Sequence, residues 1–233
     1  MPIISMQSII NDRYAIDWLR MRDFRTLTLT ICTVPAMLQV ALIFWLNTVP
    51  VLVSSAQQIN YDVYLNEKRV GYLLARRARK DDLTNYWIES NVNFRFVFKM
   101  NFNYTFETVF QNDMLIRAST RNTVNDDEKG SSKVTWNGKF YQMEVKNERS
   151  ELKNTRIIYS MSMLYFQEPR QISQVFSERY AKFLPIRAVK EHAYELTMPD
   201  GKKNIYSYVN GICQAVEVQH SVGKISFRLK NQK

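Results

Sequence analysis

The sequence is poor in the residues from which most recognisable functional sites are built. Its 233 residues include two cysteines, Cys32 and Cys213, together with two histidines and six glycines. The cysteines form neither a CxxC pair nor a cluster with histidine, so they predict no disulfide framework and no zinc site. The motifs GxSxG, GxGxxG, HExxH and the P-loop are also absent. We therefore expect no metal, no cofactor and no enzyme activity.

Charged residues are more frequent, and basic ones predominate. The chain has 32 Lys and Arg against 22 Asp and Glu, which gives a formal net charge of +10 at pH 7. Such an excess favours contact with an anionic membrane surface. The basic residues form no continuous run, however, which favours the interpretation that they occupy the solvated faces of strands. Nucleic acid is not expected as a partner, because the N-terminal sequence predicts export.

Residues 1–56 are interpreted as an N-terminal extension that ends in a secretory signal peptide. A basic segment around Arg22 precedes an apolar run over 27–46, and small residues follow up to Ala56. Basic, apolar and small residues in this order are typical of a signal peptide. We expect cleavage after Ala56 and a single β domain over 57–233 that is periplasmic or associated with the outer membrane. The alternative is an inner-membrane anchor formed by 27–46.

The stretch 92–106 sets the expected architecture. Every even position in it is apolar, and Val97 is the single apolar residue at an odd position. Period two is typical of a β-strand with one buried face. A strand that continued this pattern in both directions would be longer than a domain is wide, so we expect the chain to reverse within it. The retained parity predicts a three-residue loop at 99–101, which places Phe98 opposite Phe102.

Short alternating segments separated by turn residues continue to the C-terminus. The pairs 66–67, 137–138 and 210–211 predict hairpin turns, and the second and third of these are Asn-Gly. We expect a three-residue loop at 111–113 and an exposed loop over the polar segment 124–132. The predicted fold is mainly β, a strongly curved antiparallel meander or barrel of about twelve strands.

One short helix is expected within this β fold. Residues 155–167 carry apolar side chains at helical spacing, Asn154 precedes them as a possible cap, and Pro169 follows as a stop. A strand is the alternative, because Met161 and Met163 alternate with serines. We expect a helix here to cover one end or one face of the sheet.

Few titratable residues suggest chemistry. His192 lies beside an expected strand start and His220 near a turn, and both are interpreted as surface histidines. Glu178 and Arg179 predict an internal ion pair, and Glu107 lies on the polar face of an aromatic strand. A catalytic carboxylate pair is the less favoured alternative to a protein without enzyme activity.

Three segments resemble an exported Gram-negative family known as a domain of unknown function. They are 61–77 (YDVYLNEKRVGYLLARR), 93–115 and 194–218. The resemblance covers nearly all of 57–233 and implies export and a sheet fold, with no established activity. At the level of the fold, the pattern is also similar to periplasmic lipoprotein carriers, whose curved sheet wraps an apolar cavity. No residue role transfers from the carriers, because no motif matches.

The aromatic residues on one face lead to three functional hypotheses. The first is an envelope protein that binds or carries a lipid or another apolar ligand. The second is a structural or protein-interaction module whose core is filled by its own side chains, and the third is a small outer-membrane barrel. The candidate ligand-binding residues are Phe94, Phe96, Phe98, Phe102, Tyr104, Phe106, Met161 and Tyr165.

Overall fold

The computed structural model describes residues 55–95, 98–220 and 223–230, which belong to one compact unit. The predicted signal peptide, except for its last two residues, lies outside these ranges. No helix among the described residues is long and apolar enough to cross a membrane. The described elements are β1 (Ser55–Leu65), β2 (Lys68–Lys80), β3 (Leu83–Arg95), β4 (Lys99–Gln111), β5 (Met114–Val124), β6 (Asp127–Trp136), β7 (Tyr141–Val145), β8 (Glu148–Leu152), the 3-10 helix η1 (Met161–Tyr165), β9 (Gln174–Ser177), β10 (Lys182–Lys190), β11 (Ala193–Thr197), β12 (Lys203–Val209), β13 (Ile212–His220) and β14 (Gly223–Leu229).

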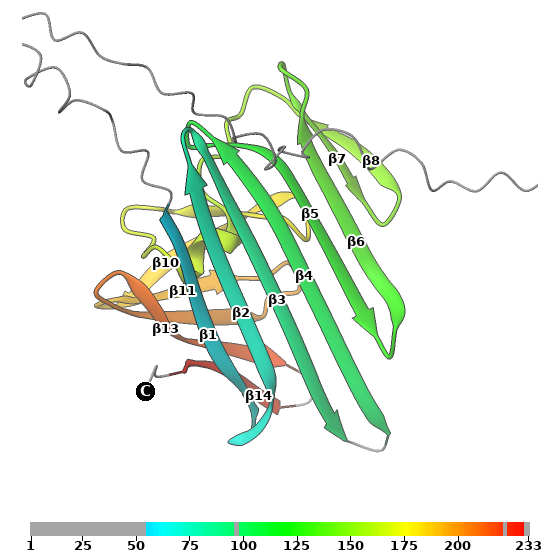
Figure 1. Ribbon diagram of the computed structural model, residues 1–233, viewed down its shortest axis with the longest axis vertical. Helices are drawn as coiled ribbons and strands as arrows, with labels where there is room; N and C mark the ends of the chain where they lie inside the picture. The colour runs from blue at the N-terminus through cyan, green and yellow to red at the C-terminus, as the bar shows by residue number, and fades with distance from the viewer. Residues whose placement is uncertain (1–54, 96–97, 221–222, 231–233) are drawn as a thin grey trace, which may run out of the picture. The chain divides into compact units, whose positions relative to one another are not determined.

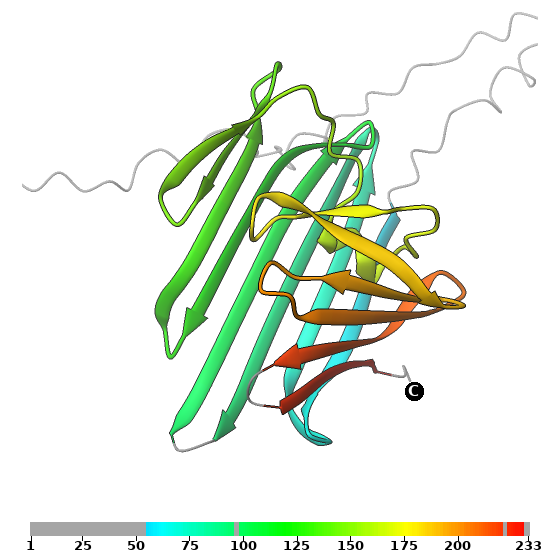
Figure 2. The same ribbon diagram turned by 180° about the vertical axis from the view of Figure 1, so that it is seen from behind.

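The strands form a 14-stranded sheet with the order β8-β7-β6-β5-β4-β3-β2-β1-β14-β13-β12-β11-β10-β9. Neighbours along the chain pair with each other except β8 and β9, and β1 pairs antiparallel with β14. The long strands β1 to β6 run side by side, and β9 to β14 cross one face of them (Figure 1 and Figure 2). The antiparallel meander is confirmed. The barrel alternative is wrong for the described residues, because the sheet is open between β8 and β9.

Tight turns rich in Asn and Asp reverse the chain between many of the strands. Both central residues have positive φ in the two-residue turns 66–67, 112–113, 125–126, 146–147 and 210–211. Asn, Asp and Gly tolerate this left-handed region better than other residues, and two such residues fit the twist of a hairpin. The predicted turns at 66–67 and 210–211 are therefore confirmed.

The chain reverses differently from the prediction on either side of β5. Gln111 pairs with Met114, so the expected three-residue loop at 111–113 is a two-residue turn. A β-bulge on β5 opposite Val109 and Phe110 then restores the inward parity of the strand. The segment 124–132 is also not a loop, because a turn at 125–126 leads directly into β6. Its polar residues belong to a strand pair, interrupted by a register shift opposite Asn122 and Thr123, that the composition did not predict.

The Asn-Gly turn between β6 and β7 is longer than predicted. Trp136 pairs with Tyr141, which leaves four residues in the connection. The side-chain oxygen of Asn137 accepts hydrogen bonds from the backbone N–H groups of Lys139 and Phe140, both at 3.0 Å. Trp136 and Tyr141 share a face of the sheet, since they are direct cross-strand partners.

The reversal inside the aromatic stretch comes earlier than predicted. Arg95, the last residue of β3, pairs with Lys99, the first residue of β4. Phe102 therefore lies opposite Val92, and the predicted pairing of Phe98 with Phe102 is wrong. The reversal itself and the retained parity are confirmed, since the buried residues of both strands are at even positions. Alternation determines which face a side chain occupies but not where the chain turns.

The segment between β8 and β9 contains less helix than predicted. Within this described segment, Met161–Tyr165 alone is helical, whereas the sequence predicted a helix over 155–167. The carbonyl of Ile157 accepts a hydrogen bond from the backbone N–H of Leu115 at 2.8 Å, and Ser160 has extended backbone angles. The backbone before η1 is therefore bonded to the sheet instead of to a further helical turn.

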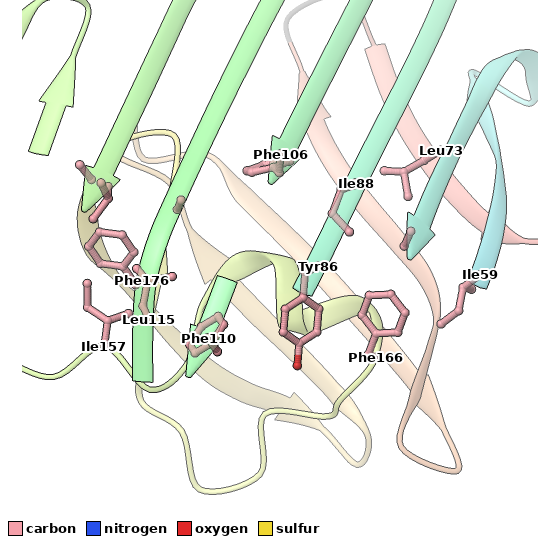
Figure 3. Close-up of a cluster of buried hydrophobic side chains, with 14 of the residues drawn as sticks. Ile59, Leu73, Tyr86, Ile88, Phe106, Phe110, Leu115, Ile157, Phe166 and Phe176 are labelled. Carbon is pink, nitrogen blue, oxygen red and sulfur yellow. The ribbon is translucent and has the colours of Figure 1, made fainter. Parts of the chain in front are cut away.

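Apolar side chains from β1–β8 and from β9–β14 pack with the segment around η1 to form the core. Figure 3 shows a part of this core that contains Tyr86 and Phe166. The ring centroids of these two residues are 5.6 Å apart. The buried hydroxyl of Tyr208 donates a hydrogen bond to the carbonyl of Leu164 at 2.8 Å. Such bonds satisfy polar groups inside the core. The segment around η1 can therefore lie between β1–β8 and β9–β14 without a large desolvation cost.

Gly71 gives a test of the close contact between β2 and β3. A Cβ atom at this position would collide with the backbone oxygen of Asn91 and lie 2.8 Å from the Cα atom of Val92. We predict that Gly71→Ala lowers the free energy of unfolding by about 1 to 3 kcal/mol, because backbone must move to admit the methyl group. Gly130→Ala in β6 is the control, since the nearest atom there is 3.7 Å away. Equal urea midpoints for the two variants, measured by tryptophan fluorescence, would contradict this prediction.

Candidate functional site

The aromatic side chains of β3 and β4 divide into a buried group and a half-exposed group. Phe106 is buried in the core, together with residues from the later strands. Phe94 and Phe102 are half-buried and stack on each other, with ring centroids 5.5 Å apart. Phe98 is 75% exposed. The predicted aromatic face is thus packed core at one end of the hairpin and accessible surface at the other.

The other candidate residues in the described part of the chain do not belong to this accessible surface. Tyr104 is half-buried and packs edge-on against Phe106, with ring centroids 4.4 Å apart. Met161 and Tyr165 belong to η1, and the ring of Tyr165 lies 5.6 Å from that of Tyr61. Phe96 lies outside the described residues.

An open cleft of about 520 Å³ lies where the β1–β2 hairpin meets the ends of β3 and β4. We call it the basic cleft. It is lined by Leu65, Lys68, Arg69, Val70, Asn93, Phe94, Arg95, Phe98 and Lys99. Phe94 and Phe98 are the two sequence-predicted residues that the structure brings into it. The cleft therefore combines part of the predicted aromatic face with cationic residues that the sequence analysis did not select.

A β-bulge lies in the part of β2 that lines this cleft. The β1–β2 register shifts after Val63, so that Gly71 pairs with Val63 and Arg69 pairs with Tyr64. In a regular strand, adjacent side chains point to opposite faces, but at a bulge they need not. Arg69, which is exposed, and Val70, which is buried, both line the basic cleft. The bulge has no clear signature in the sequence. The sequence analysis therefore selected neither Arg69 nor Val70 as a binding residue.

The basic cleft concentrates positive charge. Its described lining contains four cationic side chains and no acidic one. The nearby carboxylate of Asp62 pairs with Arg69 at 2.7 Å, and that of Glu67 pairs with Arg228 at 2.6 Å. The hydrogen bond from Arg228 lowers the pKa of Glu67. Both acids are thus engaged by partners, and Lys68, Arg95 and Lys99 remain to attract an anion.

A larger hollow, of about 610 Å³, lies over β6, β7 and β8. Its lining mixes both signs of charge, with Lys133 and Arg149 beside Glu144 and Glu151. Met143 is the one large apolar residue in that described lining. A surface with charges of both signs and a single large apolar side chain has few features of a ligand site.

The predicted ion pair between Glu178 and Arg179 is wrong. Glu178 is fully buried, and its carboxylate accepts hydrogen bonds from the backbone N–H groups of Met161 and Ser162 at 3.2 and 3.0 Å. Burial raises the pKa of Glu178 although these donors act to lower it. Arg179 is exposed, and its guanidinium carbon lies 5.6 Å from the ring centroid of Tyr104. Glu178 therefore anchors η1, which is a structural role.

A second buried carboxylate, Glu168, holds the chain after η1 against β11. Its side chain is 4% exposed and lies 3.0 Å from Nδ1 of His192 and 2.9 Å from the donating hydroxyl of Tyr194. Arg170 pairs with the other carboxylate oxygen at 3.0 Å. Burial acts to raise the pKa of Glu168, but the hydrogen bonds from His192, Tyr194 and Arg170 outweigh it, so this pKa lies below its ordinary value. Sequence analysis placed His192 on the surface and missed this contact.

The lowered pKa of Glu168 makes part of the stability dependent on pH. Because the folded pKa is below the unfolded one, the ionised carboxylate stabilises the fold above about pH 4.3, and this contribution is lost as pH falls through the folded pKa. We predict that Glu168→Gln lowers the free energy of unfolding by about 1 to 3 kcal/mol at pH 7. The difference from wild type should shrink on acidification.

Glu191→Gln is the matched control for this prediction, because Glu191 is next to His192 and its side chain is exposed. Urea unfolding of the three proteins at neutral and acidic pH provides the measurement. A deficit of Glu168→Gln that stays constant with pH would contradict the assignment.

Comparison with known proteins places the chain in a family without assigned activity. A family model described as a domain of unknown function, DUF6134, matches residues 61–230. No curated protein matches the chain. One similar solved structure is the crystal structure of a beta-barrel-like protein of the domain of unknown function DUF1849 from Brucella abortus. It has 11% sequence identity and a TM-score of 0.47, covering 77% of this chain and 97% of that chain. The protein belongs to the DUF6134 family of unknown function.

Proposed function

We propose that the protein binds an amphiphilic ligand, with an apolar chain and an anionic head group, in the basic cleft. The observation that carries this proposal is the composition of the lining, which contains four cationic and four apolar side chains. Small-molecule sites typically combine apolar surface with a few charged groups that fix the orientation of the ligand. The cations would hold the head group, while Leu65, Val70 and Phe94 would contact the chain.

The accessible end of the aromatic face provides a path for the apolar chain. Phe94 lines the cleft and stacks on Phe102, so apolar surface continues from the cleft onto β4. The end of the β3–β4 hairpin reaches past β9 to β14, which cross another part of these strands (Figure 2). A chain lying on these rings would gain about 0.8 kcal/mol for each CH₂ group removed from water.

The proposal is for binding without catalysis. The described lining of the basic cleft has no histidine, cysteine, hydroxyl or carboxylate side chain that could act as a nucleophile or base. The buried carboxylates of Glu168, Glu178 and Glu195 lie outside that lining and are bound by donors of the protein itself. Their hydrogen bonds support structural roles.

A structural or protein-interaction module is the second candidate function. The observation in its favour is the filled core, in which Phe106, Phe110, Phe166 and Phe176 are all buried. Much of the aromatic face is therefore used for stability and leaves the cleft end as the part free to bind. The two candidates differ in whether an apolar ligand occupies that end.

Location in the cell envelope is also part of the proposal. It rests on the basic, apolar and small residues of the segment before Gln57. Ser55 and Ala56 begin β1 and are exposed, so cleavage after Ala56 would remove two residues from the start of a strand. N-terminal sequencing of the protein from an envelope fraction should find Gln57 first. A chain that retains 27–46 and sediments with the inner membrane would instead support the anchor.

Titration with lysophosphatidylglycerol below its critical micelle concentration tests the binding proposal. We expect saturable binding that Arg95→Gln and Phe94→Ala each weaken by about tenfold, because one variant removes a head-group contact and the other a chain contact. Arg117→Gln and Phe140→Ala are the controls, since these residues lie outside the lining of the basic cleft. Calorimetry gives the affinity, and urea unfolding confirms that each variant is folded.

Absence of binding by the wild-type protein would contradict the proposal and leave the interaction module as the better explanation. Binding that Arg95→Gln and Phe94→Ala do not affect would place the ligand elsewhere and also contradict it.

A further inference from the structure

The end of the β3–β4 hairpin has a charge arrangement that is unfavourable in the free protein. Arg95 and Lys99 are direct cross-strand partners at the last pair of the hairpin. Like charges at directly opposite positions destabilise a sheet. The described lining of the basic cleft, to which both residues belong, supplies no carboxylate to offset this repulsion. An anion outside the protein would relieve it.

An exposed aromatic side chain lies beside these two cations. Phe98, the residue before Lys99, is 75% exposed, which is the highest value among the large exposed hydrophobic residues of the described chain. Exposing a phenylalanine ring to water is unfavourable, whereas a ring flanked by cations suits the boundary between lipid head groups and acyl chains. The hairpin end thus combines the two features that favour an anionic lipid surface.

The hairpin end also projects beyond its neighbours. Pairing of β4 with β5 stops at Phe102 and Val124, whereas pairing of β4 with β3 continues as far as Lys99. The end of the hairpin accordingly extends past the β5–β6 turn (Figure 1). Directly after that turn, Asp127 at the start of β6 pairs with Lys129 at 3.3 Å, which reduces the repulsion between Asp127 and an anionic surface.

We infer that the end of the β3–β4 hairpin docks onto an anionic phospholipid bilayer. Phe98 enters the interfacial region, while Arg95, Lys99 and Lys68 contact lipid phosphates. The inference rests on the proposed function, because it names the bilayer as the source of the amphiphile that the basic cleft binds. Each cation near an anionic surface contributes enough attraction to change the partition coefficient by about fivefold.

Cosedimentation of the full chain, purified without detergent, with phosphatidylcholine vesicles tests this inference. Vesicles that also contain phosphatidylglycerol should bind the protein, and vesicles of phosphatidylcholine alone should bind it at least tenfold less. Binding should decrease in about 1 M salt, where the screening length falls to about 3 Å. Equal binding to both vesicle types, or binding that salt does not affect, would overturn the inference.

Two variants locate the contact on the hairpin. Lys99→Gln should lower the partition coefficient by about fivefold and Phe98→Ser by about tenfold. Lys190→Gln and Ile158→Ser, which alter an exposed cation and an exposed hydrophobic residue elsewhere, should leave partitioning unchanged. If these control variants lose as much binding as the hairpin variants, the docking surface is not this hairpin and the inference fails.

Stability measurements separate docking from a structural role of the same cation. Removing one member of the Arg95–Lys99 pair relieves repulsion, so Lys99→Gln should keep or raise the urea midpoint while it weakens vesicle binding. A lowered midpoint would show that Lys99 supports the fold and would contradict the inference.

Titration with soluble lysophosphatidylglycerol distinguishes the two proposals. Wild-type protein that binds this ligand but not anionic vesicles refutes docking and leaves the proposed function intact. Protein that binds vesicles but not the ligand refutes the proposed function, and with it the clause that the bilayer supplies the ligand.

Discussion

The pairing of β1 with β14 is the interaction on which the rest of the architecture depends. Five residue pairs, from Tyr61 with Leu229 to Leu65 with Ile225, join the first strand of the described chain to the last. Without them, β1–β8 and β9–β14 would be separate sheets with two further exposed edges. The hydroxyl of Tyr61 adds a hydrogen bond of 2.8 Å to the carbonyl of Cys213 in β13. Because the ends of the domain are joined, the opening of the sheet falls in the middle of the chain.

That opening determines the role of the segment between β8 and β9. A connection that enters a core must satisfy its backbone polar groups there. Glu178 does this at the start of η1, Tyr208 accounts for the carbonyl of Leu164, and Glu168 fixes the chain after the helix. The burial of Glu168 and Glu178 is thus explained by the path of the chain. The basic cleft lies apart from them, at the ends of hairpins whose positions the joined sheet determines.

Sequence patterns predicted faces more reliably than positions along the chain. Alternation identified the buried face of β3 and β4, but it is equally compatible with any reversal that keeps the parity, including the observed one between Arg95 and Lys99. Of the basic cleft, Phe94 and Phe98 could be selected because they belong to the aromatic pattern. Arg69 and Val70 could not, since their place beside β3 depends on the pairing of β2 with β3. Such non-local pairings leave little trace in local sequence.

The joined ends of the sheet also affect how the protein reaches its folded state. The backbone N–H of Asn66 bonds to the carbonyl of Lys224 at 3.0 Å, across a separation of 158 residues. Contacts between such distant positions require closure of a very long loop and are characteristic of slow folding. Among the described strands β1 comes first and β14 last, so this edge of β1 stays uncovered until the C-terminal strands have joined the sheet. The interval before that closure is when the chain is most exposed to misassembly.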